Sequence, residues 1–301
     1  MSVVIPFRRE FAFEYGRLEP VAPTIRRIVA RNPGPFTFKG TGTYVVGSGD
    51  VALIDPGPDL AEHVEALLAG LSRERVTHIL VTHTHRDHSP AAAALKAATG
   101  APTFGFGPHA GGRRGEPGVE EGGDWDFVPD ITLRDGDRIA GHGWAFEAVH
   151  TPGHTSNHLC FALADSGVLF SGDHVMGWST SVIAPPDGDM AAYLASLGRL
   201  LDRHDLVYWP THGPAVTEPQ RHVRAFIAHR HEREAGILDC LRAGIGGIDA
   251  IVERLYVGLQ PGLRRAAGRS VQAHLIDLAG RGLVASDGPP TLKTHYRLAR
   301  D

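Results

Sequence analysis

Short apolar runs separated by turn residues dominate the first two thirds of the chain and predict β-strands. Residues 43–46 and 51–54 flank the turn Gly47-Ser48-Gly49-Asp50, a pattern typical of a β-hairpin. Residues 76–82 form an apolar run that indicates a buried strand. Further strands are expected at residues 145–149, 158–163, 168–171 and 206–209.

Helical periodicity alternates with these strands. Within 59–71, apolar residues recur at the spacing of one helix face, and Asp59 stands before them as the expected N-cap. Residues 89–100 carry Ser89 as the expected N-cap, Pro90 at the first helical position and Gly100 as the stop. A third helix is expected from residue 189 to about 201. Strands and helices of this kind suit one large α/β core.

The pattern changes at Thr217, where strands give way to a long helical stretch that ends near Gly244. Two more helices are expected, at 248–256 and around Val271, followed by a small hairpin that ends at 295–298. Helix, helix, helix and hairpin is the order of a winged helix. We therefore expect two domains, residues 1–216 and residues 217–301.

Composition places the chain among soluble globular proteins, because 42% of its residues are hydrophobic and 21% are charged. No apolar run approaches the roughly 20 residues that cross a bilayer, and charges interrupt the start MSVVIPFRREFAFEYG where a signal peptide would be apolar. We expect a cytoplasmic protein that does not enter a membrane. Cys160 and Cys240 have no CxxC spacing, so buried free thiols are expected.

Charge is distributed unevenly along the chain. The net charge is −4, yet residues 221–301 hold 13 Lys and Arg against 8 Asp and Glu. The remainder is therefore acidic and the tail basic. A basic tail is compatible with a polyanion near it, but a solvated helix face is the better explanation of this excess.

Three imidazoles and a carboxylate occur within six positions in His83-Thr84-His85-Arg86-Asp87-His88, directly after the strand at 76–82. A loop at a strand end can turn such side chains inward, and their nitrogen and oxygen atoms suit Zn²⁺, Mn²⁺ and Fe²⁺. Three further turns each follow a β-type run and carry one ligand-type residue, at His154 in TPGHT, Asp173 in SGD and His212 in THGP. The four segments predict a metal site.

In this order and at these separations, HTHRDH, TPGHT, SGD and THGP resemble the metal-binding motifs of the metallo-β-lactamase superfamily over roughly residues 35–215. The resemblance implies an αββα sandwich with the metals at one rim. It implies a first ion on His83, His85 and His154, a second ion on Asp87, His88 and His212, and Asp173 as the bridge between them. Two divalent cations follow, with zinc favoured and manganese or iron as alternatives.

A hydroxide shared by two such cations would be the nucleophile of a hydrolase. Asp87 is the catalytic residue that we expect to orient it or to receive its proton. His158 is expected to bind substrate or to orient a ligand from behind. Asp55 is expected either to accept a hydrogen bond from a ligand imidazole or to cap a turn.

The superfamily covers several chemistries, so flanking features have to select among them. Aspartate at 173, where two-zinc β-lactam-cleaving enzymes commonly have cysteine, argues against antibiotic hydrolysis. The tail, with His229, Arg230, Arg233 and Glu234, is similar to the β-lactamase-like-protein-2 branch, which includes an endoribonuclease acting on single-stranded RNA. Hydrolysis of RNA phosphodiesters is therefore our leading hypothesis, and a small molecule is the alternative substrate.

Three rival interpretations remain open. One is a thioesterase that resembles glyoxalase II, a second is an iron-dependent persulfide dioxygenase, and a third is a non-catalytic protein with a structural metal. Within the Gly-rich and acidic excursion at 105–130, Glu120, Glu121, Asp124 and Asp126 would repel RNA if they lined the cleft. The sequence is also compatible with a homodimer.

Overall fold

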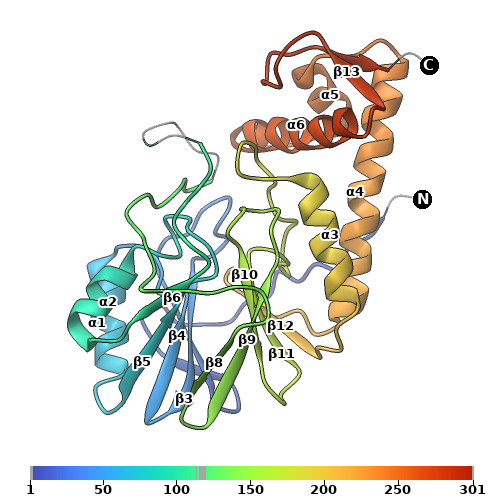
Figure 1. The fold of residues 1–301 in the computed structure, drawn as a ribbon. Coiled ribbons are helices and arrows are strands. Elements are labelled where there is room, and N and C mark those ends of the chain that lie inside the picture. Colours follow the sequence, from blue (N-terminus) through green and yellow to red (C-terminus); the bar gives the residue numbers. More distant parts are fainter. Residues whose placement is uncertain (1–2, 113, 115–119, 300–301) are drawn as a thin grey trace.

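The computed structural model describes residues 3–112, 114 and 120–299. Two β-sheets stack face to face with helices on both outer faces (Figure 1). The first sheet has the order β1-β2-β3-β4-β5-β6-β7, with strands Glu19–Ala22, Ile25–Val29, Gly42–Ser48, Asp50–Ile54, Arg75–Leu80, Thr103–Gly105 and Ile131–Thr132. The second has the order β12-β11-β10-β9-β8, with strands Val207–Pro210, Val168–Gly172, Leu159–Leu163, Trp144–His150 and Arg138–Gly141.

Alternation of side chains along the strands explains why both faces of the first sheet are covered. In β3, Tyr44 and Val46 point into the core between the two sheets, while Val45 points to the outer face. Helices α1 (Ala61–Gly70) and α2 (Ala91–Thr99) cover that outer face, with Leu67 and Leu95 buried against it. Helices α1 and α2 and the first sheet thus form the first two layers of the αββα sandwich.

The second sheet is covered by α3 (Met190–Leu201) and by the first part of α4 (Pro219–Arg242). Tyr193 of α3 and Phe226 of α4 are fully buried in one cluster with Leu169 of β11. Burial of two aromatic side chains and their neighbours holds both helices on the sheet.

The C-terminal elements follow the order expected for a winged helix, and they lie together beyond one end of α3 (Figure 1). They are α5 (Ile248–Leu255), the 3₁₀ turn η1 (Pro261–Leu263), α6 (Arg264–Gly280) and the antiparallel pair β13 (Val284–Ser286) and β14 (Tyr296–Leu298). Their own core includes Ile237 and Leu241 from the second part of α4. The helix α4 therefore belongs to both cores, and the expected boundary between residues 216 and 217 stays a prediction.

Two helix starts differ from the sequence prediction. Helix α1 begins at Ala61 with no side-chain cap, so Asp59 does not cap it. Helix α2 begins at Ala91, and the Ser89 hydroxyl donates to Asp124 at 2.6 Å, so it does not cap the helix either. A long-range partner has outcompeted the local capping bond in the second case. Gly100 does end α2, in the left-handed conformation that suits glycine.

Among the described residues, no helix has the length and apolar character that crossing a bilayer would require. Both cysteines are free and buried, as the sequence predicts. Of the excursion at 105–130, residues 113 and 115–119 lie outside the described part of the chain.

Candidate metal centre

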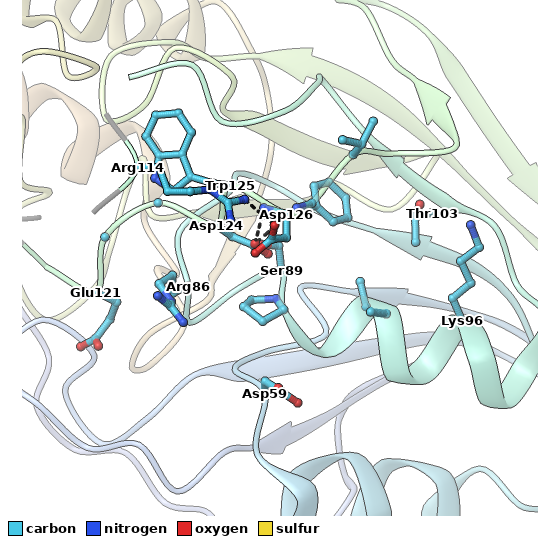
Figure 2. A pocket seen from close by; sticks show the side chains of 17 residues that line it. Asp59, Arg86, Ser89, Lys96, Thr103, Arg114, Glu121, Asp124, Trp125 and Asp126 are labelled. Carbon is cyan, nitrogen blue, oxygen red and sulfur yellow. Dashed lines mark hydrogen bonds and ion pairs between the residues drawn. The ribbon is translucent and has the colours of Figure 1, made fainter. Parts of the chain in front are cut away.

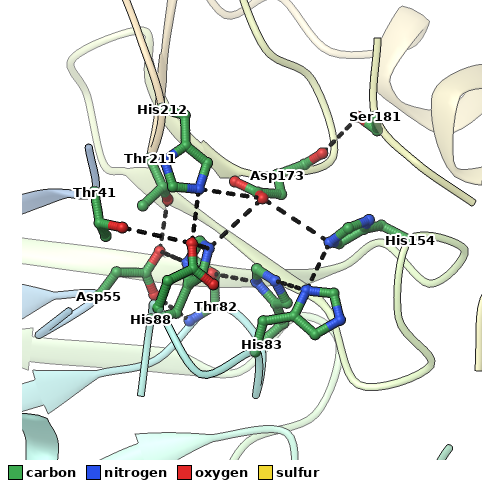
Figure 3. A network of polar contacts seen from close by, with 12 residues as sticks. Thr41, Asp55, Thr82, His83, His88, His154, Asp173, Ser181, Thr211 and His212 are labelled. Carbon is green, nitrogen blue, oxygen red and sulfur yellow. Dashed lines mark hydrogen bonds and ion pairs between the residues drawn. The ribbon is translucent and has the colours of Figure 1, made fainter. Parts of the chain in front are cut away.

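The seven candidate ligands come from four loops and meet at one site. Figure 3 shows His83, His88, His154, Asp173 and His212 turned toward one another. Their loops follow β5, β9, β11 and β12. They form groups in which the ligand atoms all lie within 4.8 Å of one another: His83 with His85 and His154, His83 with His88 and Asp173, and Asp87 with His88 and His212. All seven side chains that the sequence singles out are thus brought together.

Gly172 allows the loop after β11 to turn Asp173 toward this site. Its φ is +51°, and a Cβ added there would lie 2.5 Å from Nε2 of His158 and 3.0 Å from Cβ of Thr82. A side chain at this position would therefore clash with two buried neighbours and strain the backbone. Glycine in the SGD motif is required by packing.

Asp55 lies beneath the site at the end of β4 and is fully buried. Its Oδ1 accepts the backbone N–H of Thr82 at 2.8 Å. Its Oδ2 accepts the Thr82 hydroxyl at 2.9 Å, the Thr211 hydroxyl at 2.6 Å and Nδ1–H of His88 at 3.0 Å. Asp55 therefore accepts a hydrogen bond from the imidazole of a candidate ligand, the first of the two roles considered from the sequence, and it also joins the loops after β5 and β12.

These bonds fix which nitrogen of His83 carries the proton. The Thr82 hydroxyl donates to Asp55, so at its 3.0 Å contact with His83 it accepts Nδ1–H. Nε2 of His83 is then unprotonated, and its lone pair faces the centre of the candidate metal site. The same reasoning applies to His88, whose Nδ1 donates to Asp55 and whose Nε2 also points inward.

His154 and His212 are oriented in the same way by backbone carbonyls. Nδ1 of His154 donates to the carbonyl of Val182 at 2.8 Å, and Nδ1 of His212 donates to the carbonyl of Gly40 at 3.2 Å. In both rings Nε2 is left for the centre. A hydrogen bond from the outer nitrogen is the usual arrangement of a metal-binding imidazole, because it fixes the ring and makes the inner nitrogen more basic.

The first group consists of three nitrogen atoms at close range. Nδ1 of His85 lies 3.1 Å from Nε2 of His83 and 3.2 Å from Nε2 of His154. A tetrahedral zinc bound at roughly 2.0–2.1 Å from each nitrogen would keep such atoms about 3.3 Å apart. Burial lowers the pKa of all three imidazoles. Neutral imidazole is the form that binds a metal.

The second group concentrates carboxylates on two imidazoles. Oδ2 of Asp87 lies 3.0 Å from Nε2 of His212 and 3.4 Å from Nε2 of His88, and Oδ2 of Asp173 lies 3.4 Å and 3.6 Å from the same atoms. Burial alone would raise the pKa of both carboxyl groups, but the two imidazoles outweigh it and lower the pKa. Reciprocally, burial would lower the pKa of His88 and His212, and the carboxylates raise it.

Two buried polar atoms in this group lack a hydrogen-bond partner among the described residues, namely Nε2 of His88 and Oδ1 of Asp173. Such atoms are costly in a protein interior unless a ligand or an ion satisfies them. The inward lone pairs and the gathered negative charge meet the requirements of a divalent cation. The residues therefore fit the two metal ions that the motifs imply.

His158 is oriented away from any substrate. It has no exposed surface, its Nε2 accepts the backbone N–H of Asp173 at 3.2 Å, and its Nδ1 donates to the Thr151 hydroxyl at 2.8 Å. Both ring nitrogens are engaged, which leaves neither available to a bound molecule. Of the two roles expected for His158, the geometry fits orientation of a ligand, here Asp173, and argues against substrate binding.

The acidic part of the 105–130 excursion lies against residues 81–90, the loop between β5 and α2 that carries His83, His85, Asp87 and His88 and is called the metal loop below. The backbone N–H of Arg86 donates to the carbonyl of Gly122 at 3.0 Å, and that of Asp124 donates to the carbonyl of Thr84 at 2.8 Å. This short antiparallel contact brings the carboxylate of Glu120 into a ligand-type group with His154 and Asp173. Sequence reasoning singled out the acidic run but did not assign Glu120 to the site, because nothing local marks that pairing.

A second contribution that sequence reasoning missed comes from α4. The guanidinium of Arg230, only 3% exposed, donates to the carbonyl of Ser181 and lies 5.3 Å above the ring of Tyr193. The Ser181 hydroxyl in turn donates to the carbonyl of Asp173, and the adjacent Val182 is the acceptor for His154. Arg230 thus connects the C-terminal helix to the loop that supports two candidate ligands.

A pocket of about 790 Å³ adjoins the metal loop. Its wall includes Arg86, Ser89 and Pro90 from that loop, Lys96 from α2, and Glu121 and Trp125 from the excursion. Figure 2 shows Arg86 and Lys96 at opposite ends of it. Lys96 is paired with Asp130, whereas the exposed guanidinium of Arg86 forms no ion pair with another side chain in the described part of the chain.

Comparison with known families gives two matches in this chain. Residues 37–212 match the metallo-beta-lactamase superfamily, and residues 248–289 match the beta-lactamase associated winged helix domain. Together with the observed layers, these matches confirm the αββα fold and the C-terminal winged helix expected from the sequence.

Individual relatives agree with this assignment. A beta-lactamase-like protein 2 homolog from Caenorhabditis elegans is 29% identical over 92% of this chain and 91% of its own length. An atrochrysone carboxyl ACP thioesterase from Claviceps purpurea is 32% identical over 73% of this chain and 66% of its own length. The crystal structure of a metallo-beta-lactamase family protein from Thermus thermophilus superposes with a TM-score of 0.75 at 24% identity, covering 93% of this chain and all of that one.

Proposed function

This chain belongs to the metallo-β-lactamase superfamily of hydrolases, and on that premise we propose that it hydrolyses an acyl thioester with two bound divalent cations. The observation that carries the proposal is the convergence of seven imidazole and carboxylate ligands whose inner atoms face one another. Zinc is the metal that we expect, with manganese or iron as alternatives.

When bound, the cations would lower the pKa of a water molecule and polarise the carbonyl oxygen of the substrate. The protein's own groups then position the reaction. Oδ2 of Asp87 accepts the Thr41 hydroxyl at 3.5 Å and lies 3.0 Å from Nε2 of His212, which leaves Oδ1 to orient the attacking water and to accept its proton. As the carbon–oxygen bond forms, the carbon–sulfur bond breaks and the sulfur takes up a proton.

The charge around the site supports a thioester over RNA. Three carboxylates of the acidic run, Glu121, Asp124 and Asp126, line the pocket beside the metal loop. RNA lying across this pocket would meet these carboxylates, whereas an uncharged thioester carbonyl would not be repelled by them. RNA, our leading hypothesis from the sequence, therefore becomes the second candidate.

The pocket beside the metal loop supplies room for the thiol portion of such a substrate. Trp125 and Phe127 offer apolar surface, and Arg86, next to Asp87 in the sequence, offers a cation. A thiol carried on a phosphorylated arm would bind with its anionic group on Arg86. The similarity to a protein named as an ACP thioesterase supports this assignment.

Hydrolysis of single-stranded RNA remains the second candidate because of the C-terminal domain. Winged helices frequently bind nucleic acid, and residues 221–301 carry an excess of Lys and Arg. Under this alternative the tail would hold the RNA and the metal centre would cleave it.

One parallel assay distinguishes the two. The zinc-loaded protein is incubated with acyl-CoA thioesters, with neutral N-acetylcysteamine thioesters and with a fluorescent single-stranded RNA oligomer. We expect thiol release from thioesters and an intact oligomer. Cleavage of RNA without thiol release would replace the proposal by its alternative, and no reaction with either substrate class would remove both.

Substitution of Asp87 tests whether the hydrolytic activity depends on the candidate metal centre. Asp87→Asn should reduce turnover by at least about 100-fold because it removes a ligand charge and the proton acceptor. Asp239→Asn, an exposed residue at the far end of α4, is the matched control and should retain full activity. Equal turnover in both variants would contradict the role of Asp87.

A further inference from the structure

Glu120 is the one side chain beyond the seven, among residues 3–112, 114 and 120–299, that joins a group able to hold a metal ion. A carboxylate oxygen of Glu120 and the ligand atoms of His154 and Asp173 all lie within 4.8 Å of one another. Neither the motifs nor the family resemblance assigns a role to this residue. Its neighbour Glu121 lines the adjoining pocket and joins no such group within the described residues.

The backbone keeps Glu120 in this position. Arg86 and Asp124 make the two hydrogen bonds that hold residues 122–124 beside the metal loop, and Gly123 forms a bridge with His85. Glu120 itself has a φ of +45°, a left-handed conformation that is uncommon for glutamate. Such backbone conformations persist where surrounding structure enforces them.

The charges at this point are unfavourable without a cation. The Glu120 carboxylate faces that of Asp173, whose side chain is almost completely buried and whose Oδ1 has no hydrogen-bond partner in the described part of the chain. Two like charges at such a separation repel each other strongly in a medium of low dielectric constant. A metal ion between them would turn this repulsion into attraction.

We propose that Glu120 is an additional ligand of the metal centre and binds the cation on the side of His154 and Asp173. Two divalent cations carry four positive charges, of which Asp87 and Asp173 neutralise two, and Glu120 neutralises a third. Carboxylate oxygen is a suitable ligand for zinc, manganese and iron alike. The proposal rests on the metal-dependent function above, because it requires that the seven ligands hold ions.

The test measures the affinity for zinc directly and compares the same Glu→Gln substitution at two adjacent positions. Wild type, Glu120→Gln, Glu120→Asp and Glu121→Gln are each loaded with zinc, and affinity is measured by competition with a chromophoric chelator. The cobalt forms are compared by absorption spectroscopy. We expect Glu120→Gln to weaken the binding of one ion at least about 10-fold and to alter the cobalt spectrum, Glu120→Asp to keep part of the affinity, and Glu121→Gln to match wild type.

The remaining outcomes would contradict either the role of Glu120 or the proposed function. Equal losses in Glu120→Gln and Glu121→Gln would mean that only the local charge matters, and unchanged affinity in Glu120→Gln would exclude Glu120 as a ligand. Both results leave the proposed hydrolase intact. A wild-type protein that binds no divalent metal would instead refute the proposed function itself. Circular dichroism of each variant confirms that the fold is retained.

Discussion

The carboxylate of Asp55 and the imidazole of His88 are joined by a 3.0 Å hydrogen bond that is completely shielded from solvent. Asp55 directly follows β4, and His88 lies in the metal loop after β5. The same carboxylate oxygen accepts the Thr211 hydroxyl, next to His212. One buried acid therefore sets the position of two candidate ligands from different loops.

Asp55→Asn should weaken binding of the ion held by His88 and His212. The amide cannot accept all the hydrogen bonds that the carboxylate accepts, so His88 loses the charged partner that fixes its proton on Nδ1. Changes to such supporting groups typically cost about 10- to 100-fold in metal affinity. Metal content after dialysis against a weak chelator measures the effect. Asp50→Asn, on the preceding strand but ion-paired with Arg75 at the exposed end, should bind metal as wild type does.

The pH dependence of stability should contain a contribution from His63, outside the metal centre. Burial lowers the pKa of His63 to about 4, and its hydrogen bond with the Pro56 carbonyl offsets this only in part. Between that value and the unfolded value of about 6.5, only the unfolded chain binds the extra proton, so the free energy of unfolding falls as the pH falls. Below about pH 4 the contribution levels off.

His63→Gln removes this titration while its amide can still donate to Pro56. Between about pH 7 and about pH 4.5 the wild type should lose about 2 kcal/mol more of unfolding free energy than the variant does. Urea denaturation of both metal-free proteins at the two pH values measures the difference, and metal release cannot contribute. Parallel pH profiles would show that His63 does not titrate as its burial implies.

Arg230→Met should weaken metal binding without lowering the stability of the metal-free protein, because Arg230 supports the segment around Ser181. Methionine fills a similar volume beside Tyr193 and removes a buried charge whose Nε has no hydrogen-bond partner among the described residues, which offsets the cost of leaving the Ser181 carbonyl without its donor. The Ser181 carbonyl, however, loses its donor, so the loop that holds His154 and Asp173 is less well ordered. We expect an unchanged melting temperature in the metal-free protein and weaker zinc binding. Arg233→Met, one turn along α4 and in contact with Tyr256, should bind zinc normally.

Local sequence patterns were sufficient to predict several strands, one helix end and the ligand motifs. The strands at 43–46 and 51–54 and the stop at Gly100 follow from side-chain periodicity and glycine conformation, which depend on neighbours in the sequence. The ligand motifs can be recognised in the sequence because each candidate ligand stands within a short turn of a few characteristic residues. Their convergence follows once the strands that precede them are placed in two stacked sheets.

What could not be predicted depends on partners distant in the sequence. Ser89 has the features of a helix cap, yet Asp124 is available 35 positions later and takes its hydroxyl. Glu120 belongs to a segment with no periodicity, so only its backbone pairing with the metal loop reveals its position. Arg230 lies on a helix whose exposed and buried faces both contain charged residues, and its burial depends on the contact with Ser181. Tertiary contacts decide all three.

Arg86 should determine how well the enzyme recognises the thiol part of its substrate. Its exposed guanidinium lines the pocket next to Asp87 and forms no ion pair with another side chain of the described residues, so it can bind an anionic group of the substrate. Arg86→Ala should raise the KM for an acyl-CoA thioester about 2- to 5-fold, a magnitude typical of one solvent-exposed charge contact, with kcat nearly unchanged.

The neutral N-acetylcysteamine thioester of the same acid provides the internal control, because it has no group for Arg86 to bind. Its KM should be the same in Arg86→Ala and in wild type. Arg114→Ala is the matched variant, since Arg114 lines the same pocket but is ion-paired with Asp126. An equal rise in KM for both thioesters would indicate that Arg86 shapes the metal loop and does not bind the thiol arm. Because both thioesters carry the same acyl group, a KM change confined to the acyl-CoA thioester reports on the contact between Arg86 and the thiol part.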